Sequence, residues 1–202
     1  MSGYLKIIDK MITEDGLLCQ LRIPNIEVKN LYRKIIKEWL SGNQGIEYYS
    51  QFILYLLTGN IPAFEMQLQD TLESVISTYD LANNPEAFYH GLMLGLTASL
   101  CDDKRYELLS NRETGYGRCD FLILSHDATR PSIVLEFKRV APDDNLDRLM
   151  QKLETAAVAG LMQIEMQNYV AEAKKRGNPH VIQLAIAFCG KRFVLKSSVN
   201  ND

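Results

Sequence analysis

The sequence predicts an α/β protein with a mixed central sheet flanked by helices. Apolar runs typical of β-strands occur at 118–125, 131–138 and 182–188. Apolar residues recur at helical spacing at 87–101 and again from Leu146 onward. This succession of a leading helix, strands, helices and closing strands fits an α/β core with a mixed sheet.

Length and composition limit the class of protein. At 202 residues, the chain is long enough for one ordinary domain with an appendage or for two small domains. Its 47% hydrophobic and 23% charged residues are typical of a soluble globular protein, and we expect neither a membrane-spanning segment nor a signal peptide. Four scattered cysteines without a CxxC motif favour reduced thiols in a cytoplasmic protein over disulfides or zinc. The net charge of −3 is unlike that of a typical nucleic-acid-binding protein, although residues 101–202 carry 15 basic against 14 acidic side chains.

The first 80 residues predict a mainly helical subdomain. We expect a short helix within residues 5–12 and a strand at Gly16–Ile23. Three helices follow, because apolar residues recur at helical spacing between turn residues. These three predicted helices cover 26–40, 46–57 and 63–79. Their apolar stripes are expected to pack together without chemistry, which divides the chain into predicted domains 1–80 and 81–202.

The second half is predicted to begin with the helix at 87–101. Asn83, Asn84 and Pro85 precede it, as is typical of a helix start. A strand is expected at 105–112, ahead of the two central strands. The remaining predicted elements are helices at 146–160 and 161–176, strands at 182–188 and 192–196, and a loose tail from Ser197.

Three charged residues stand out in the two central strands. Asp120 begins the apolar run of the first strand, and Glu136 and Lys138 lie near the end of the second. Because side chains alternate along a strand, Glu136 and Lys138 point to one face and Phe137 to the other. Two converging carboxylates are costly unless a cation compensates them, and hard oxygen ligands favour Mg²⁺ or Mn²⁺. A lysine beside such a metal could orient a water molecule and stabilise charge on a phosphate.

Asp120, fifteen further residues and then Glu136-Phe137-Lys138 resemble the D…(D/E)-x-K signature of the PD-(D/E)XK nuclease superfamily. The surrounding segments resemble the branch found as the C-terminal half of bacterial AAA-ATPase-like proteins. These segments are PEAFYHGLMLGL, SNRETGYGRCD, VLEFK, AGLMQIEMQNY and AIAFCGK. The segment RIPN-x-EV resembles the junction between the two halves of such proteins, and because the chain begins just before it, we expect the ATPase-like half to be absent.

The resemblance implies a restriction-endonuclease-like core and a set of site residues. Asp120, Glu136 and the main-chain carbonyl of Phe137 would bind Mg²⁺ or Mn²⁺, and Lys138 would activate water. Glu86 occupies the place from which the superfamily's leading helix often donates an acid. As an alternative, Glu86 only complements the helix dipole.

Further residues are candidates for assisting catalysis or binding phosphate. Gln163 and Tyr169 match the family's Gln-x5-Tyr, and Gln163 could orient water or remain an ordinary surface glutamine. Arg112 and Arg118 flank a glycine turn and could bind phosphate, or they could be solvated turn residues. His90 is expected to be a structural or phosphate-facing residue, since no second histidine lies at ligand spacing.

The favoured hypothesis is a Mg²⁺-dependent nuclease that cuts DNA, with RNA less favoured. The alternative is a catalytically silent module that binds nucleic acid or protein on the same fold. A third interpretation makes Asp120 and Glu136 partners of nearby basic residues in a purely structural sheet. A homodimer formed through the N-terminal helices would let two sites cut two strands.

Overall fold

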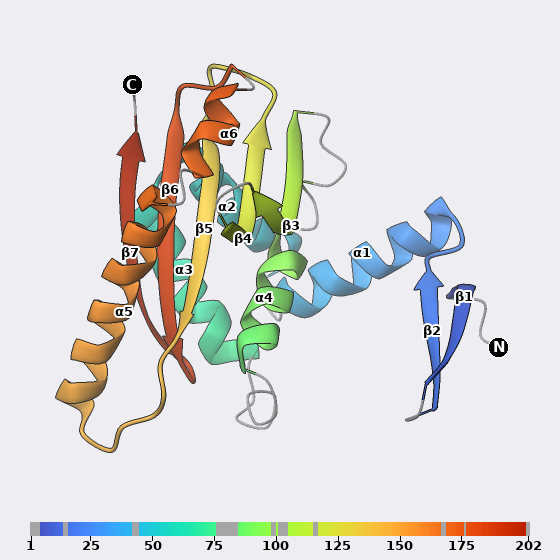
Figure 1. The fold of residues 1–202 in the computed structure, drawn as a ribbon, viewed down its shortest axis with the longest axis horizontal. Coiled ribbons are helices and arrows are strands. Elements are labelled where there is room, and N and C mark those ends of the chain that lie inside the picture. The colour runs from blue at the N-terminus through green and yellow to red at the C-terminus, as the bar shows by residue number, and fades with distance from the viewer. Residues whose placement is uncertain are drawn as a thin grey trace.

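A five-stranded mixed sheet forms the centre of the molecule (Figure 1). The computed structural model describes residues 5–13, 16–41, 45–75, 85–97, 100, 105–114, 117–166, 169–175 and 177–200. The strands lie in sequence order and are β3 (Tyr106–Thr114), β4 (Gly117–Ser125), β5 (Ser132–Arg139), β6 (Val181–Cys189) and β7 (Arg192–Asn200). Only β5 and β6 are parallel neighbours within this sheet, and the helices α5 (Leu146–Met166) and α6 (Tyr169–Lys175) connect them. A helical crossover is what a parallel pair requires.

Helices α5 and α6 cover one face of the sheet. Leu153 and Ala157 of α5 pack with Ala187 of β6, and Val170 of α6 packs with Leu122 of β4. The helix α5 begins at a well-formed cap, because the side chain of Asn145 accepts a hydrogen bond from the main-chain N–H of Arg148 at 3.0 Å. Glu136 and Lys138 lie on this face, beside Gly160 of α5.

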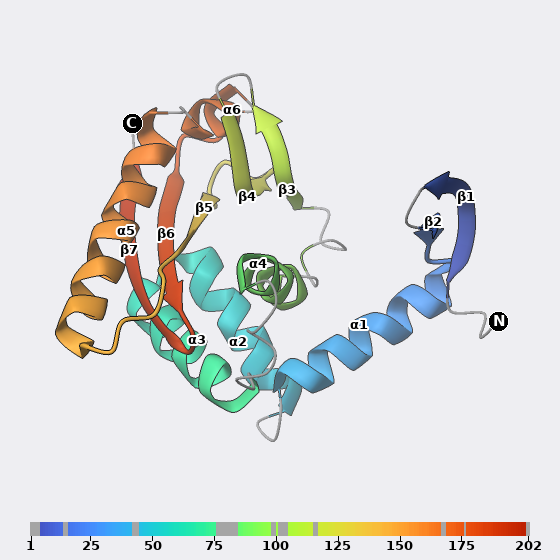
Figure 2. The same cartoon turned by 60° about the horizontal axis from the view of Figure 1, so that its bottom comes forward.

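The other face of the sheet is covered by α2 (Gly45–Thr58), α3 (Ile61–Val75) and α4 (Pro85–Leu96) (Figure 2). Their apolar side chains share one contiguous core with the sheet. Tyr89 of α4 shows this directly, because its ring stacks on Phe188 of β6 at 4.1 Å. The largest fully buried side chains of this core are Phe52, Phe64, Phe121 and Phe188.

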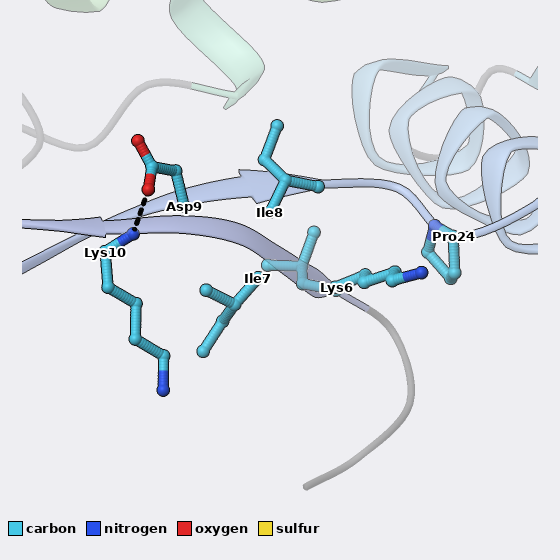
Figure 3. A pocket seen from close by; sticks show the side chains of 7 residues that line it. Lys6, Ile7, Ile8, Asp9, Lys10 and Pro24 are labelled. Atoms are coloured by element: carbon cyan, nitrogen blue, oxygen red, sulfur yellow. Dashed lines mark hydrogen bonds between the residues drawn. The ribbon is translucent and has the colours of Figure 1, made fainter.

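A hairpin of β1 (Lys6–Thr13) and β2 (Gly16–Arg22) lies apart from the sheet, at the far end of α1 (Ile26–Ser41) (Figures 1 and 2). An open hollow of about 750 Å³ lies on this hairpin, lined by residues 5–10 and Pro24 (Figure 3). Several large apolar side chains of the hairpin are exposed, among them Ile12 at 87% and Leu17 at 60%. An isolated two-stranded hairpin is only marginally stable in water, so this element is suited to packing against a further surface.

The predicted fold class is confirmed, and most predicted elements are present within a few residues. Three predictions were wrong. The helix expected within residues 5–12 is the strand β1, because its apolar residues pair across the hairpin with β2. The two helices expected at 146–160 and 161–176 are instead one helix to Met166, followed by the short α6. The tail expected to be loose from Ser197 continues β7, where Ser197 pairs with Leu184 and Asn200 with Val181.

The proposed division at residue 80 stays a prediction. Apolar residues of α2 and α3 belong to the same buried cluster as those of β4, β5 and β6. Cys19 and Cys189 are free thiols and only half-buried. Within the described residues, no helix is both long and apolar enough to cross a membrane.

Candidate active site

Asp120 and Glu136 lie opposite each other where β4 and β5 stop pairing. The register joins Phe121 to Leu135 as the last paired residues at this end, and Asp120 and Glu136 are each one position further on. Alternation along each strand places both carboxylates on the face covered by α5, together with Lys138. The prediction that Glu136 and Lys138 share a face is therefore consistent with the register, and the register adds Asp120 to that face.

The side chain of Asp120 makes a hydrogen bond that a main-chain carbonyl would make if β4 and β5 continued to pair. Its Oδ2 accepts a hydrogen bond from the main-chain N–H of Phe137 at 2.9 Å. The Asp120 residue itself is half-buried. The ring of Phe137 packs in the core on the opposite face, near Phe121 and Phe188. Asp120 is thus tied to the residue between Glu136 and Lys138.

Glu136 is the buried carboxylate of the group, with only 3% of the residue exposed. Its Oε1 accepts a hydrogen bond from the ammonium group of Lys138 at 2.8 Å. Its Oε2 is buried and has no hydrogen-bond partner among the described residues. Burial raises the pKa of Glu136 and the Asp120 charge adds to this, while the bond from Lys138 opposes it. An unpartnered, buried carboxylate oxygen is costly, so this atom is a candidate for a ligand contact.

Lys138 is held between the sheet and α5. Besides Glu136, its Nζ donates to Oε1 of Gln163 at 2.5 Å. The Lys138 side chain is 26% exposed, so its tip lies at the border between the core and solvent. An ammonium group has three donors, and no third acceptor for it is found among the described residues. One N–H therefore remains available to a substrate or a water molecule.

The donor set fits a hard divalent cation. Asp120 and Glu136 supply carboxylate oxygens from adjacent strands, and Glu136 Oε2 lacks another partner in the described part of the chain. The described residues contain no group of three or more His, Cys, Asp or Glu side chains that could hold a metal. Mg²⁺ commonly uses one or two carboxylates and completes its shell with water and phosphate. The two carboxylates can hold it on those terms.

Comparison with known protein families decides the relationship. A family model described as the PD-(D/E)XK nuclease superfamily matches residues 84–198, which is more than half of the chain. The chain belongs to the PD-(D/E)XK nuclease superfamily. The mixed five-stranded sheet flanked by helices is the restriction-endonuclease-like fold expected of that superfamily. Neither a curated protein nor a solved structure matches the chain.

For four of the predicted site residues, the structure describes the main chain but not the side chain. Only their main-chain positions can be given: Glu86 is the second residue of α4, and Tyr169 is the first residue of α6. Arg112 pairs with Cys119, and Arg118 pairs with Glu113, at the end of the β3–β4 hairpin. Their assignments to the site stay predictions.

His90 is not brought to the cluster. It lies on α4, on the opposite face of the sheet, where its Nε2 is 2.6 Å from the hydroxyl of Ser110. Its ring packs edge-on against Phe121 and Phe137. Because α4 covers the face away from Asp120, this position supports the structural role expected for His90 and gives no support to contact with substrate phosphate.

Two further residues reach this face and were not singled out from the sequence. Gly160 of α5 lies directly over Ala185 of β6, beside Lys138. Gln183 of β6 is buried on the α5 side, and its Oε1 has no partner among the described residues. The sequence does contain features that could have identified both residues. Gln183 is the one polar residue in the run IQLAIAF, and Gly160 interrupts an apolar helical stripe.

Proposed function

We propose that this protein is a Mg²⁺-dependent nuclease that hydrolyses phosphodiester bonds, with DNA as the substrate. The observation that supports this is the buried Glu136 carboxylate, which has one oxygen held by Lys138 and the other without a partner among the described residues. Asp120 faces it across the end of the strand pair. A purely structural ion pair would be expected to use both oxygens of a carboxylate this deeply buried.

Asp120 and Glu136 would hold the metal ion, and the main-chain carbonyl of Phe137 would be a third ligand. Phe137 donates its N–H toward Asp120. In an extended strand the N–H and C=O of one residue point to the same side, so its carbonyl is expected on the Asp120 side as well. When bound, Mg²⁺ or Mn²⁺ would act as a Lewis acid on a phosphate oxygen and lower the pKa of a coordinated water.

Lys138 would position the reacting groups. Gln163 and Glu136 each accept one of its ammonium hydrogens, which fixes the direction of the third. That third N–H would donate to a non-bridging phosphate oxygen or to the attacking water as negative charge develops. Gln163 thus acts on Lys138 directly, through the 2.5 Å hydrogen bond, in addition to any contact of its own with water.

The assignment of DNA rests on the position of the arginines and on the family resemblance. Arg118 precedes Asp120 by two residues along β4, a position on the same face of an extended strand. Arg112 lies on the adjacent edge strand at the same end, but it pairs with Cys119, so alternation puts it on the face covered by α4 and it would reach a phosphate only around the edge of the sheet. We propose that both residues, with Tyr169 at the start of α6, contact the phosphates of the substrate. Glu86 is at the start of α4 on the opposite face, so it would have to reach past the ends of β4 and β5 to add a third acid.

Cleavage assays test this function. Purified protein is incubated with supercoiled plasmid, single-stranded DNA and RNA, with Mg²⁺, with Mn²⁺ or with a chelator. We expect metal-dependent cleavage of DNA and a loss of about 100-fold or more in Lys138→Ala. The matched control is Lys152→Ala, an exposed lysine of α5 that pairs with Asp143 and should cut normally. Equal cleavage by Lys138→Ala would contradict the proposed role.

The exposed hairpin supports a homodimer as the assembly of this chain. Apolar residues lie on both faces of the hairpin, because Ile12 pairs with Leu17 and Met11 pairs with Leu18 on the opposite face. Ile12 is 87% exposed, and Met11, Leu17 and Leu18 are each more than half exposed. We propose that a second copy of this chain covers this surface, so the dimer contact would be on the hairpin and not on the N-terminal helices expected from the sequence.

Light scattering coupled to size exclusion tests the dimer. The wild-type chain should elute with twice the mass of the monomer, and the double variant Ile12→Lys/Leu17→Lys should elute as a folded monomer. A monomeric wild-type chain would contradict the dimer. Such a monomer would leave an ATPase-like protein of the kind implied by the sequence resemblance as the occupant to test next.

A further inference from the structure

Gly160 lies at the closest approach between α5 and the sheet. A Cβ atom built on Gly160 would lie 2.8 Å from the Cβ of Ala185, 3.5 Å from Cγ of Lys138 and 3.8 Å from Cγ of Glu136. A separation under 3.0 Å is essentially never seen for real Cβ atoms, and the atom met here is a Cβ fixed to the backbone of a buried strand. The helix could accept a side chain at 160 only by moving away from β6.

Glycine is needed at this position for space and not for backbone conformation. Gly160 is inside a continuous helix, and its φ is not among the positive values of the chain. Glycine is less favourable than alanine in a helix interior, so an α5 that contains it is weaker as an isolated helix. In compensation, the backbone of α5 can approach β6 closely, because Ala185 is the only residue of the Gly160–Ala185 contact that has a Cβ.

The same contact lies one helical turn from Gln163. Residues three apart on a helix are neighbours on its surface, and Gln163 accepts the ammonium hydrogen of Lys138 at 2.5 Å. A hydrogen bond tolerates a separation of only a few tenths of an ångström beyond its usual length. An outward shift of α5 by the thickness of a methyl group would therefore separate Gln163 from Lys138.

We propose that Gly160 and Ala185 form a spacer that sets the height of α5 over the sheet and so holds Gln163 against Lys138. Gly160 is in this sense a positioning residue for the site, and the inference rests on the proposed nuclease function only for its effect on cleavage. Ala185 is the cross-strand neighbour of Glu136, so the spacer rests on β6, the strand beside the one that carries Glu136 and Lys138.

Exchanging glycine and alanine between positions 160 and 185 tests whether stability depends on the number of methyl groups in the contact and not on which position carries the methyl group. Gly160→Ala should lower the melting temperature by about 2–6 °C, because a second methyl group does not fit. Ala185→Gly should lower it by about 1–3 °C, through the small void and the flexibility of glycine in a strand. The double variant Gly160→Ala/Ala185→Gly again has one methyl group in the contact and should melt above Gly160→Ala. Gly91→Ala is the matched control, because a Cβ on this exposed helical glycine would meet nothing within 4 Å.

A zero-length cross-link reports the Lys138 contact without requiring enzymatic activity. In a Gln163→Glu background, a carbodiimide can join residue 163 to the Lys138 amine, and mass spectrometry identifies the product. We expect the cross-link to form in this background and in the Gly91→Ala control. It should be lost when Gly160→Ala is added and return when Ala185→Gly is added as well. Cleavage should follow the same order, with kcat reduced about 10-fold or more and KM little changed in Gly160→Ala.

The outcomes distinguish this inference from the proposed function. If the cross-link and the melting temperature follow the swap while no variant cuts DNA, the spacer stands and the nuclease function fails. If Gly160→Ala keeps the cross-link and melts like Gly91→Ala, the spacer is overturned whatever the protein cuts. If the double variant melts no higher than Gly160→Ala and its cross-link stays lost, the coupling between positions 160 and 185 is overturned.

Discussion

Oδ2 of Asp120 accepts the main-chain N–H of Phe137 at 2.9 Å, at the point where β4 and β5 stop pairing. A side chain thus satisfies a donor that a continuous ladder would have satisfied with a carbonyl. The contact leaves the two strands joined while their ends separate. It also fixes Asp120 beside Glu136, so one carboxylate serves the sheet and the site together.

Asparagine in place of Asp120 should keep this structural contact, because its side-chain carbonyl can accept the same hydrogen bond. We expect Asp120→Asn to unfold within about 0.5 kcal/mol of the wild type, whereas Asp120→Ala should lose about 1–2 kcal/mol. Chemical denaturation in a chelating buffer measures both. Equal destabilisation by the two variants would show that the hydrogen bond to Phe137 is not what Asp120 contributes to stability.

Neutralising Glu136 should stabilise the metal-free protein. Burial and the nearby Asp120 raise the pKa of Glu136 despite the bond from Lys138, so the charged form is disfavoured in the folded state. We expect Glu136→Gln to increase the free energy of unfolding at neutral pH by on the order of 1 kcal/mol in a chelator. Glu154→Gln, an exposed partner of Lys196, should change it little. A large loss of stability in Glu136→Gln would favour a structural role for the ion pair with Lys138.

Asn178 is expected to be the most sensitive polar residue outside the site. It is 2% exposed, and its amide donates to the carbonyl of Arg130 at 2.9 Å while its Oδ1 accepts from His180 N–H at 3.1 Å. Asn178→Ala leaves these buried main-chain groups without partners and should cost about 2–3 kcal/mol. Asn145→Ala, which removes the cap of α5, should cost about 1 kcal/mol and provides a graded comparison. Chemical denaturation of both variants tests whether Asn178→Ala lowers the free energy of unfolding more than Asn145→Ala does.

Tyr89 should make stability depend on alkaline pH. Burial raises its pKa to about 12, above the ordinary value of 10, while its hydroxyl donates to the carbonyl of Gly190 at 2.6 Å. A raised folded-state pKa means that the contribution is present below about pH 10 and is lost as the pH rises toward 12. Tyr89→Phe should be about 1 kcal/mol less stable at pH 7, and this difference should shrink above pH 10. A stability difference between the wild type and Tyr89→Phe that stays constant up to pH 12 would contradict the raised pKa of Tyr89.

The central hairpin and the shared face of Glu136 and Lys138 could be predicted because they depend on local rules. Apolar runs fix the strands, and alternation fixes the face. The bond between Lys138 and Gln163 could not be predicted as geometry, since it depends on how closely α5 approaches the sheet.

Gly160 shows why a local rule failed. Within the sequence it resembles a helix break, and two helices were expected on either side of it. In the structure α5 runs through it, because the glycine faces Ala185 and the close packing compensates for its low helix propensity. The position of His90 on the opposite face could not be predicted either, since neither its spacing nor its neighbours in the sequence reveal which face of the sheet α4 covers.

The most direct test of the central claim is calorimetric titration of the metal-free protein with Mg²⁺ and Mn²⁺. We expect saturable binding by the wild type and by Asp143→Asn, which removes a carboxylate paired with Arg148 and Lys152. Binding should weaken about 10-fold or more in Asp120→Asn and in Glu136→Gln, both of which keep the shape of the site. Wild-type protein that binds neither metal, or that binds as tightly without Asp120 as with it, would contradict the proposed metal site.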